Sequence, residues 1–258
     1  LSTIDTAIWD IVGKTANLPL HRLFGACRTK IKTYASGGLW LSQSIDSLLK
    51  DTQNFLDQGF RSMKIRVGST NWKNDVERVK EVRNAIGPDI ELMADINQAL
   101  EPKQAIQLGK ELEEYDLLWL EEPVASNNRE GHAEVRSALA TPIASGENEY
   151  SLSGMHEMIE AKACDILMPD LQRIGGISEM RKVANLAESY NLPISTHIFT
   201  EHSLSVAGSV TNCLSVEHMP WFSKLFNEQI YVINGYIDIP ERPGTGFTFN
   251  ESYIKLIN

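Results

Sequence analysis

Residues 91–97, Glu-Leu-Met-Ala-Asp-Ile-Asn, contain a short apolar run that is followed by an acid. The same pattern recurs at 118–123, Leu-Trp-Leu-Glu-Glu-Pro, and at 144–148, Ala-Ser-Gly-Glu-Asn. Apolar runs of this length are typical of buried strands in parallel sheets, and here longer segments with helical periodicity separate them. The alternation predicts repeated strand–helix units.

Eight strand-like runs follow one another from about residue 30 onward. They are Ile31–Ser36, Ser62–Val67, Glu91–Asp95, Leu117–Leu120, Pro142–Ser145, Asp165–Met168, Pro193–Thr196 and Cys213–Val216. Helices are predicted between them at Ile45–Gln58, Asn74–Ile86, Pro102–Tyr115 and Ile177–Tyr190. Because parallel strands need right-handed crossovers, eight of them close most simply into a TIM-type α/β barrel, (β/α)8-like but ending in a strand, (β/α)7β. An open doubly wound sheet is the alternative.

The two ends of the chain do not follow this alternation. A helix is predicted at Thr3–Lys14, and the tail after Trp221 holds a strand-like stretch at Ile230–Ile233. We therefore divide the chain into three segments. They are an opening helix with its linker (1–29), the barrel (30–220) and a C-terminal segment (221–258).

The composition excludes several classes of protein. The formal net charge is −10 and the basic residues form no stripe, so we expect no nucleic-acid binding. No run of about 18 apolar residues occurs, so we expect no membrane association. Cys27, Cys164 and Cys213 lie far apart and outside any CxxC spacing, which indicates neither a disulfide framework nor a zinc site and favours the cytoplasm.

Three acids occupy equivalent places after successive apolar runs. Asp95, Glu121 and Glu147 are equally spaced, 26 residues apart, which is about one strand–helix unit. In a barrel, residues at the carboxyl ends of the strands face the mouth, so we expect these carboxylates to converge. Converging carboxylates repel one another unless a cation lies between them, and oxygen ligands favour Mg²⁺. One such acid alone could equally be a helix cap, so the hypothesis depends on all three.

Later runs end in further acids and an imidazole. Asp170 and His197 follow neighbouring predicted strands, where the carboxylate can orient the ring for acid–base chemistry. A structural hydrogen-bonding histidine is the alternative. Glu217 follows the last predicted strand.

Lys64 and Arg66 are two residues apart on one predicted strand, so their side chains share a face. They are candidates for contacts with an anionic substrate. Long basic side chains that reach out to solvent from a partly buried strand end are the alternative.

These residues, in this order and spacing, resemble the mandelate racemase group of the enolase superfamily, in the mandelate racemase/muconate lactonizing enzyme family. The matching strings are Asp95-x-Asn97-Gln98, Trp119-Leu120-Glu121-Glu122-Pro123, Gly146-Glu147, Gly175-Gly176-Ile177-Ser178 after Asp170, and the opening Ile4-Asp5-x-Ala7-x-Trp9-Asp10. Two parts of the tail, 225–229 and 242–247, are similar to acid-sugar dehydratases of the galactarate/talarate type. The resemblance covers nearly the whole chain.

The resemblance implies a role for each candidate residue. Asp95, Glu121 and Glu147 would bind Mg²⁺, Asp170 and His197 would form the catalytic dyad, and Lys64, Arg66 and Glu217 would complete the catalytic set. It also implies removal of the proton next to a carboxylate, through an enediolate that Mg²⁺ and Lys64 stabilise. Family members carry an N-terminal α+β capping domain, which we expect this chain to lack, and they assemble as dimers or octamers.

Arg66 departs from the family pattern, in which racemases have a second lysine that acts as a base. A guanidinium is always protonated, so Arg66 is a poor base and a better clamp for a carboxylate or hydroxyl. This difference favours dehydration of an acid sugar to a 2-keto-3-deoxy acid. A racemase, epimerase or cycloisomerase of the same superfamily and a catalytically silent barrel that binds metal or sugar acids remain alternatives. The candidate substrate contacts are Tyr34, Ser36, Trp40, Lys64, Arg66 and Asn97.

Overall fold

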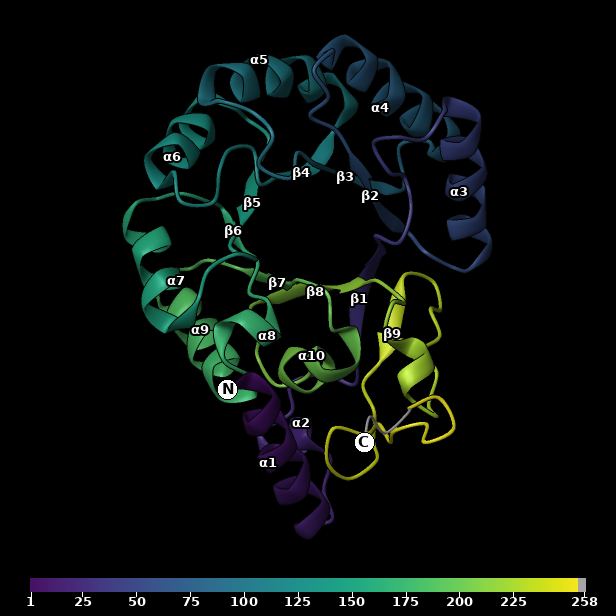
Figure 1. Cartoon of the computed structure of the whole chain (residues 1–258), viewed down its shortest axis with the longest axis vertical. Coiled ribbons are helices and arrows are strands. Elements are labelled where there is room, and N and C mark those ends of the chain that lie inside the picture. Colours follow the sequence, from purple (N-terminus) through teal and green to yellow (C-terminus); the bar gives the residue numbers. More distant parts are fainter. Residues whose placement is uncertain (255–258) are drawn as a thin grey trace.

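Eight parallel strands close into a ring, and helices cover its outside (Figure 1). The computed structural model describes residues 1–254. Its strands are β1 (Lys30–Ala35), β2 (Ser62–Arg66), β3 (Glu91–Asp95), β4 (Leu117–Glu121), β5 (Ile143–Ser145), β6 (Ile166–Leu167), β7 (Ile194–Thr196) and β8 (Cys213–His218). Each strand pairs with the next one along the chain, and β1 pairs with both β2 and β8, so the ring is complete. The predicted closed barrel is confirmed, and the open doubly wound sheet is excluded.

The five predicted helices form within a few residues of their predicted bounds, and five further helices were not predicted. They are α1 (Ser2–Thr15), α2 (Leu20–Leu23), α3 (Ile45–Asp57), α4 (Trp72–Ile86), α5 (Pro102–Leu112), α6 (Arg129–Ala138), α7 (Ser151–Glu160), α8 (Leu171–Ile174), α9 (Ile177–Ser189) and α10 (Thr200–Ala207), with 3₁₀ turns η1 (Glu113–Tyr115) and η2 (Ser223–Leu225). The Ser44 side chain caps α3, and Glu101 with Gln104 forms a reciprocal cap on α5. The helix predicted to continue to Tyr115 ends at Leu112. The next three residues form η1, and Asp116 after them has the left-handed conformation. No helix within residues 1–254 is both long and apolar enough to cross a membrane.

The strand predicted at Ile230–Ile233 is wrong. Residues 230–232 have no regular structure, and residue 233 makes only an isolated bridge. The strand is instead β9 (Tyr236–Asp238), which pairs antiparallel with β1. Asn234 and Gly235 have φ angles of 51° and 80°, and the tight turn that they form brings the later residues beside β1. β-Branched residues favour a strand, but the pairing edge that is available determines which segment becomes one.

The opening helix α1 packs against the outside of the barrel beside α8 and α9 (Figure 1). Asp5 accepts hydrogen bonds from the Ser178 backbone N–H (2.9 Å) and hydroxyl (2.5 Å), and Trp9 Nε1 donates to the same hydroxyl (2.8 Å). Gly176 has a φ of 100°, and a Cβ added there would lie 2.6 Å from the Asp5 carboxylate. The opening string that contains Asp5 and Trp9 therefore contacts the string that contains Gly176 and Ser178.

The C-terminal segment also contacts α1. The Thr245 backbone N–H and hydroxyl donate to Asp10 Oδ1 at 2.9 and 3.0 Å. Both ends of the described chain are thus tied to each other as well as to the barrel. The division at residues 29 and 220 stays a prediction.

An apolar cluster, which we call the lower layer, lies inside the barrel. Its members are Tyr34, Met93, Trp119, Ala144, Ile166 and Met168. The Tyr34 and Trp119 rings meet edge to face, with their centroids 5.4 Å apart. Every member is at most 5% exposed, so the lower layer is a packed core and not a channel.

Candidate active site

The charged residues predicted from the sequence lie at the carboxyl ends of the strands. We call these residues, together with the neighbouring Glu122 and Arg173, the upper layer. Lys64 and Arg66 lie on β2, Asp95 ends β3, Glu121 ends β4 and Glu217 lies on β8, while Glu147, Asp170 and His197 follow β5, β6 and β7. The register places Arg66 opposite Asp95 and Asp95 opposite Glu121. Asp170 and His197 are joined by a parallel bridge. The strand pairing therefore brings these eight residues to one end of the barrel.

Lys64 lies among three carboxylates. Its Nζ is 2.5 Å from Glu121 Oε1, 3.0 Å from Glu217 Oε1 and 3.4 Å from Asp95 Oδ2. Its side chain is 1% exposed, and burial alone would favour the neutral amine. The attraction of Glu121 and Glu217 outweighs burial and holds the pKa of Lys64 well above its usual range. Lys64 is therefore a fixed, buried cation at the mouth of the barrel.

Acids outnumber bases in the upper layer. Its carboxylates are Asp95, Glu121, Glu122, Glu147, Asp170 and Glu217, and its bases are Lys64, Arg66, Arg173 and His197. The six carboxyl groups therefore outnumber the four bases by two. Burial raises the pKa of Glu121 to about 8 despite the nearby Lys64. The upper layer therefore lacks positive charge, which a divalent cation would supply.

The three predicted metal ligands make different hydrogen bonds and ion pairs. Glu121 Oε1 turns toward Lys64, and Glu147 Oε2 lies 3.2 Å from His197 Nε2. Asp95 accepts hydrogen bonds from the Asn97 backbone N–H (2.8 Å) and side-chain amide (3.1 Å). Across residues 1–254, no three His, Cys, Asp or Glu side chains are arranged as a complete metal site. Direct convergence of these acids thus stays a prediction.

Asp170 and His197 form a hydrogen-bonded pair. Asp170 Oδ2 lies 2.7 Å from His197 Nδ1, while its Oδ1 accepts the backbone N–H groups of Gln172 and Arg173 at 2.7 and 2.9 Å. Asp170 therefore caps α8 and orients the imidazole at the same time. Burial opposes the charge of His197, but its hydrogen bond to Asp170 and the carboxylates of Glu147 and Glu217 raise its pKa to about 9.

Glu217 links Lys64 to the histidine side of the mouth. Its Oε2 accepts the Ile198 backbone N–H at 2.8 Å and lies 4.0 Å from His197 Nε2. Burial would raise the pKa of Glu217, but the charges of Lys64 and His197 lower it to about 2. Glu217 is therefore ionised and available as a hydrogen-bond acceptor.

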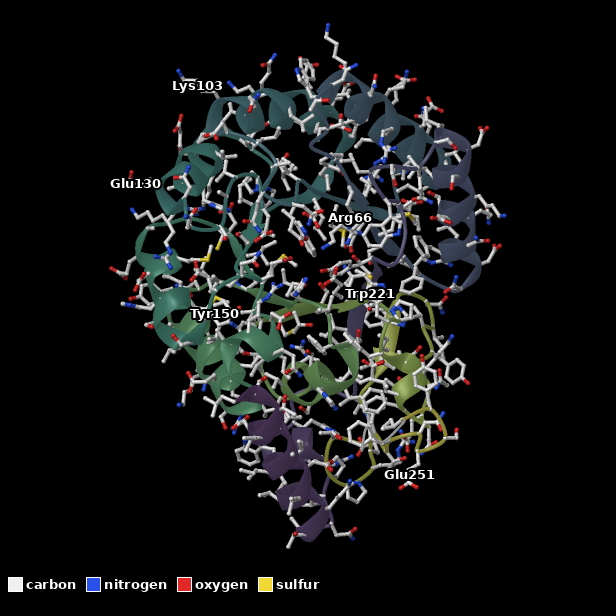
Figure 2. All side chains as sticks on the ribbon, viewed as in Figure 1. Arg66, Lys103, Glu130, Tyr150, Trp221 and Glu251 are labelled. Atoms are coloured by element: carbon white, nitrogen blue, oxygen red, sulfur yellow. The ribbon has the colours of Figure 1, made fainter. Side chains whose placement is uncertain are left out.

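Arg66 is held by Ser36 and by an aromatic ring. Its Nη1 donates to the Ser36 carbonyl (2.9 Å) and its Nη2 to the Ser36 hydroxyl (2.8 Å). The guanidinium carbon lies 4.6 Å from the centre of the Trp40 ring, and Nε lies 3.7 Å from Asp95 Oδ2. Figure 2 shows Arg66 inside the ring of strands, whereas Lys103 and Glu130 point outward from the surrounding helices. The alternative of a basic side chain that reaches out to solvent does not apply, because Arg66 is 6% exposed.

The other predicted substrate contacts differ in their surroundings. Tyr34 is fully buried in the lower layer, and its ring centre lies 5.6 Å from Lys64 Nζ. Its hydroxyl has no hydrogen-bond partner among the described residues. Ser36 is also fully buried, where it contacts Arg66, while Asn97 is exposed and bound to Asp95. Their roles in substrate binding stay predictions.

Two residues of the upper layer carried no predicted role. Glu122 is 1% exposed and accepts from Gln98 Nε2 (2.8 Å) and Asn148 Nδ2 (2.9 Å). Burial and the nearby Glu147 raise its pKa to about 7. Arg173 donates to the Glu147 carbonyl at 2.9 Å. The pair of acids before Pro123 is a sequence signal from which Glu122 could have been predicted. Arg173 has no such signal, because its position at the mouth depends on how α8 is placed.

Comparison with known families agrees with this arrangement. Residues 47–253 match the sequence model of the family described as enolase C-terminal domain-like. The chain belongs to this family. The resemblance inferred from the strand-end acids is therefore confirmed, and the family accounts for the barrel.

Several enolase-family relatives match over almost the whole chain. The L-talarate/galactarate dehydratase of Salmonella typhimurium is 36% identical over 251 residues, which are 97% of this chain and 63% of the relative. The arabinonate dehydratase of Saccharolobus solfataricus is 29% identical over 266 residues, 99% of this chain and 71% of the relative. The L-talarate dehydratase of Polaromonas sp. JS666, solved in complex with Mg and L-glucarate, superposes with a TM-score of 0.94 at 34% identity, over 96% of this chain and 70% of that one. This chain thus spans less than two thirds of the length of the Salmonella relative.

Proposed function

We propose that this chain is the catalytic barrel of a Mg²⁺-dependent acid-sugar dehydratase. The reaction would remove the proton next to a carboxylate and a hydroxyl from the neighbouring carbon, which gives water and a 2-keto-3-deoxy acid. The observation that carries the proposal is the placement of Lys64 and the Asp170–His197 pair at one mouth. Relatives named as dehydratases of talarate, galactarate and arabinonate support it.

Asp95, Glu121 and Glu147 would hold the Mg²⁺ ion. The donor set consists of carboxylate oxygens, which Mg²⁺ prefers, and the upper layer has two more acids than bases. Bound Mg²⁺ would act as a Lewis acid that stabilises the negative charge developing on the substrate carboxylate. Positive charge near Glu147 would also oppose the effect of this carboxylate on His197 and favour the neutral imidazole that a base requires.

Lys64 and His197 would share the work of proton removal. Lys64 would donate hydrogen bonds to the substrate carboxylate, whose charge increases as the proton leaves. His197 Nε2 would take the proton, and Asp170 would stabilise the imidazolium through Nδ1, at 2.7 Å in the structure. The same proton can then go to the departing hydroxyl, so that one histidine serves both steps.

Arg66 disfavours a racemase that uses two bases. It lies on β2, while His197 follows β7, and β8 and β1 separate these strands on the shorter way around the ring. A guanidinium in that place is a donor and not a proton acceptor. Proton transfer from a single side suits elimination better than racemisation.

A semicarbazide assay of mono- and diacid sugars in the presence of Mg²⁺ tests this proposal. We expect a new ketone from at least one acid. If no ketone forms but the α-proton exchanges in D₂O, the barrel is an epimerase or racemase. If neither occurs while Mg²⁺ still binds, the barrel is catalytically silent.

We also propose that the protein is cytoplasmic and forms a homo-oligomer, either a dimer or an octamer. The three cysteines are free, with Cys164 and Cys213 buried, which suits a reducing compartment. The oligomer rests on the resemblance to the mandelate racemase group. Light scattering of the purified protein would measure its mass directly.

A further inference from the structure

A cation and two indole rings form a continuous stack on one side of the mouth. Trp40, in the loop between β1 and α3, lies over the Arg66 guanidinium at 4.6 Å. Trp221, which follows β8, is stacked on Trp40 with 6.4 Å between ring centres and 11° between planes. Figure 2 shows Arg66 inside the ring of strands and Trp221 at its rim. The stack therefore leads outward from the acids to the surface.

The loop that carries Trp40 is fixed from both sides. The Trp40 backbone N–H donates to Gln43 Oε1 at 2.5 Å. Arg78, which is 7% exposed on α4, donates to the carbonyls of Gln43 (2.6 Å) and Trp40 (2.9 Å). The Arg66 backbone N–H donates to the Leu39 carbonyl at 3.0 Å. A surface that is already ordered loses little entropy when a ligand binds to it.

Trp221 leaves a large aromatic surface in solvent. Its side chain is 61% exposed, although it comes directly after Pro220, which packs closely on Gly37. A hydrogen bond donor, Arg66, lies at the inner end of the stack, and its Nε has no hydrogen-bond partner among the described residues. Small-molecule sites combine aromatic walls with a few fixed polar groups in this way.

We propose that Arg66, Trp40 and Trp221 form one wall of the substrate site and determine which acid sugars react. Arg66 lies near the reacting end, because its Nε is 3.7 Å from Asp95 Oδ2. The two rings lie progressively farther from the acids, so they would pack on the carbons beyond the reacting pair. The wall thus selects six-carbon acids over shorter ones. This inference rests on the proposed function, since it takes an acid sugar as the ligand.

Calorimetric binding of galactarate and tartrate, which have six and four carbons, tests the wall separately from turnover. We expect Trp221→Ala to weaken galactarate binding about tenfold, the loss of one aromatic contact, and Trp221→Phe to restore most of it. Tartrate should bind the unmodified protein and the Trp221→Ala variant with equal affinity, or bind to neither of them. In a working enzyme the same change should raise KM for galactarate far more than it lowers kcat.

Tyr231→Ala is the matched control, because Tyr231 is 74% exposed in the same C-terminal segment and is not part of the stack. We expect it to leave galactarate binding unchanged. The wall is disproved if Trp221→Ala weakens both acids equally, if it weakens neither, or if the unmodified protein binds no galactarate. Binding without ketone formation would instead contradict the proposed dehydration and leave the wall supported.

Discussion

The upper and lower layers of the barrel share strands but have opposite character. On β3, Met93 belongs to the lower layer and Asp95 to the upper one, and on β4 the same holds for Trp119 and Glu121. In each pair the residues are two positions apart, so both point into the barrel. A shift of two residues along a strand therefore separates a packed core from a charged site.

The two layers make different contributions to stability. Burial of the apolar layer stabilises the barrel, at about 25 cal/mol for each Å² removed from water. The upper layer buries Lys64 and several carboxylates, and desolvation can cost more than such ion pairs return. Its excess of two carboxyl groups over bases would not be retained for stability alone. Substitutions in the upper layer should therefore change function, and substitutions in the lower layer should change stability.

The largest expected effect is that of Glu147→Gln. Loss of a charged oxygen ligand should abolish Mg²⁺ binding and all turnover, while the fold is retained, because the Glu147 side chain is 12% exposed and not part of the apolar core. Calorimetric titration with Mg²⁺ measures this directly. Glu134→Gln, at an exposed position on α6, is the control. Unchanged Mg²⁺ affinity in the Glu147 variant would remove it from the ligand set.

His197→Asn should lower turnover by about 10²- to 10⁴-fold, the usual contribution of a general base. Mg²⁺ and ligand binding should persist, because the imidazole is not a predicted ligand. Steady-state kinetics and calorimetry on the same sample separate the two properties, with His156→Asn on the exposed face of α7 as the control. Full activity of the His197 variant would contradict its role as the base.

Ile166→Ala, in the lower layer, should destabilise the protein by about 2–5 kcal/mol through loss of apolar contacts and creation of a cavity. Chemical denaturation measures this change, and Mg²⁺ binding should stay as it was. Ile166→Val should cost only about 0.5–1.5 kcal/mol. If Ile166→Ala instead abolished Mg²⁺ binding without loss of stability, the separation of the layers would be wrong.

The strands and the candidate residues were predictable because both depend on local pattern. An apolar run followed by an acid can be recognised in the sequence without knowing the fold, as at Asp95 and Glu121. The strand at β9 was misplaced, since its pairing depends on a turn at Asn234 and Gly235 and on the edge that β1 leaves free. Propensity alone carries no information about that edge.

The amino-acid sequence by itself determined the alternation of strands and helices and eight of the charged residues at the strand ends, because side-chain alternation and strand ends are local properties. Only the tertiary structure decided which charges meet. Lys64 on β2 lies beside Glu217 on β8 because the ring closes through β1, and Trp221 reaches Trp40 because two distant loops flank that closure. Such contacts join residues more than 150 positions apart, and their distances are set by the register and closure of the sheet.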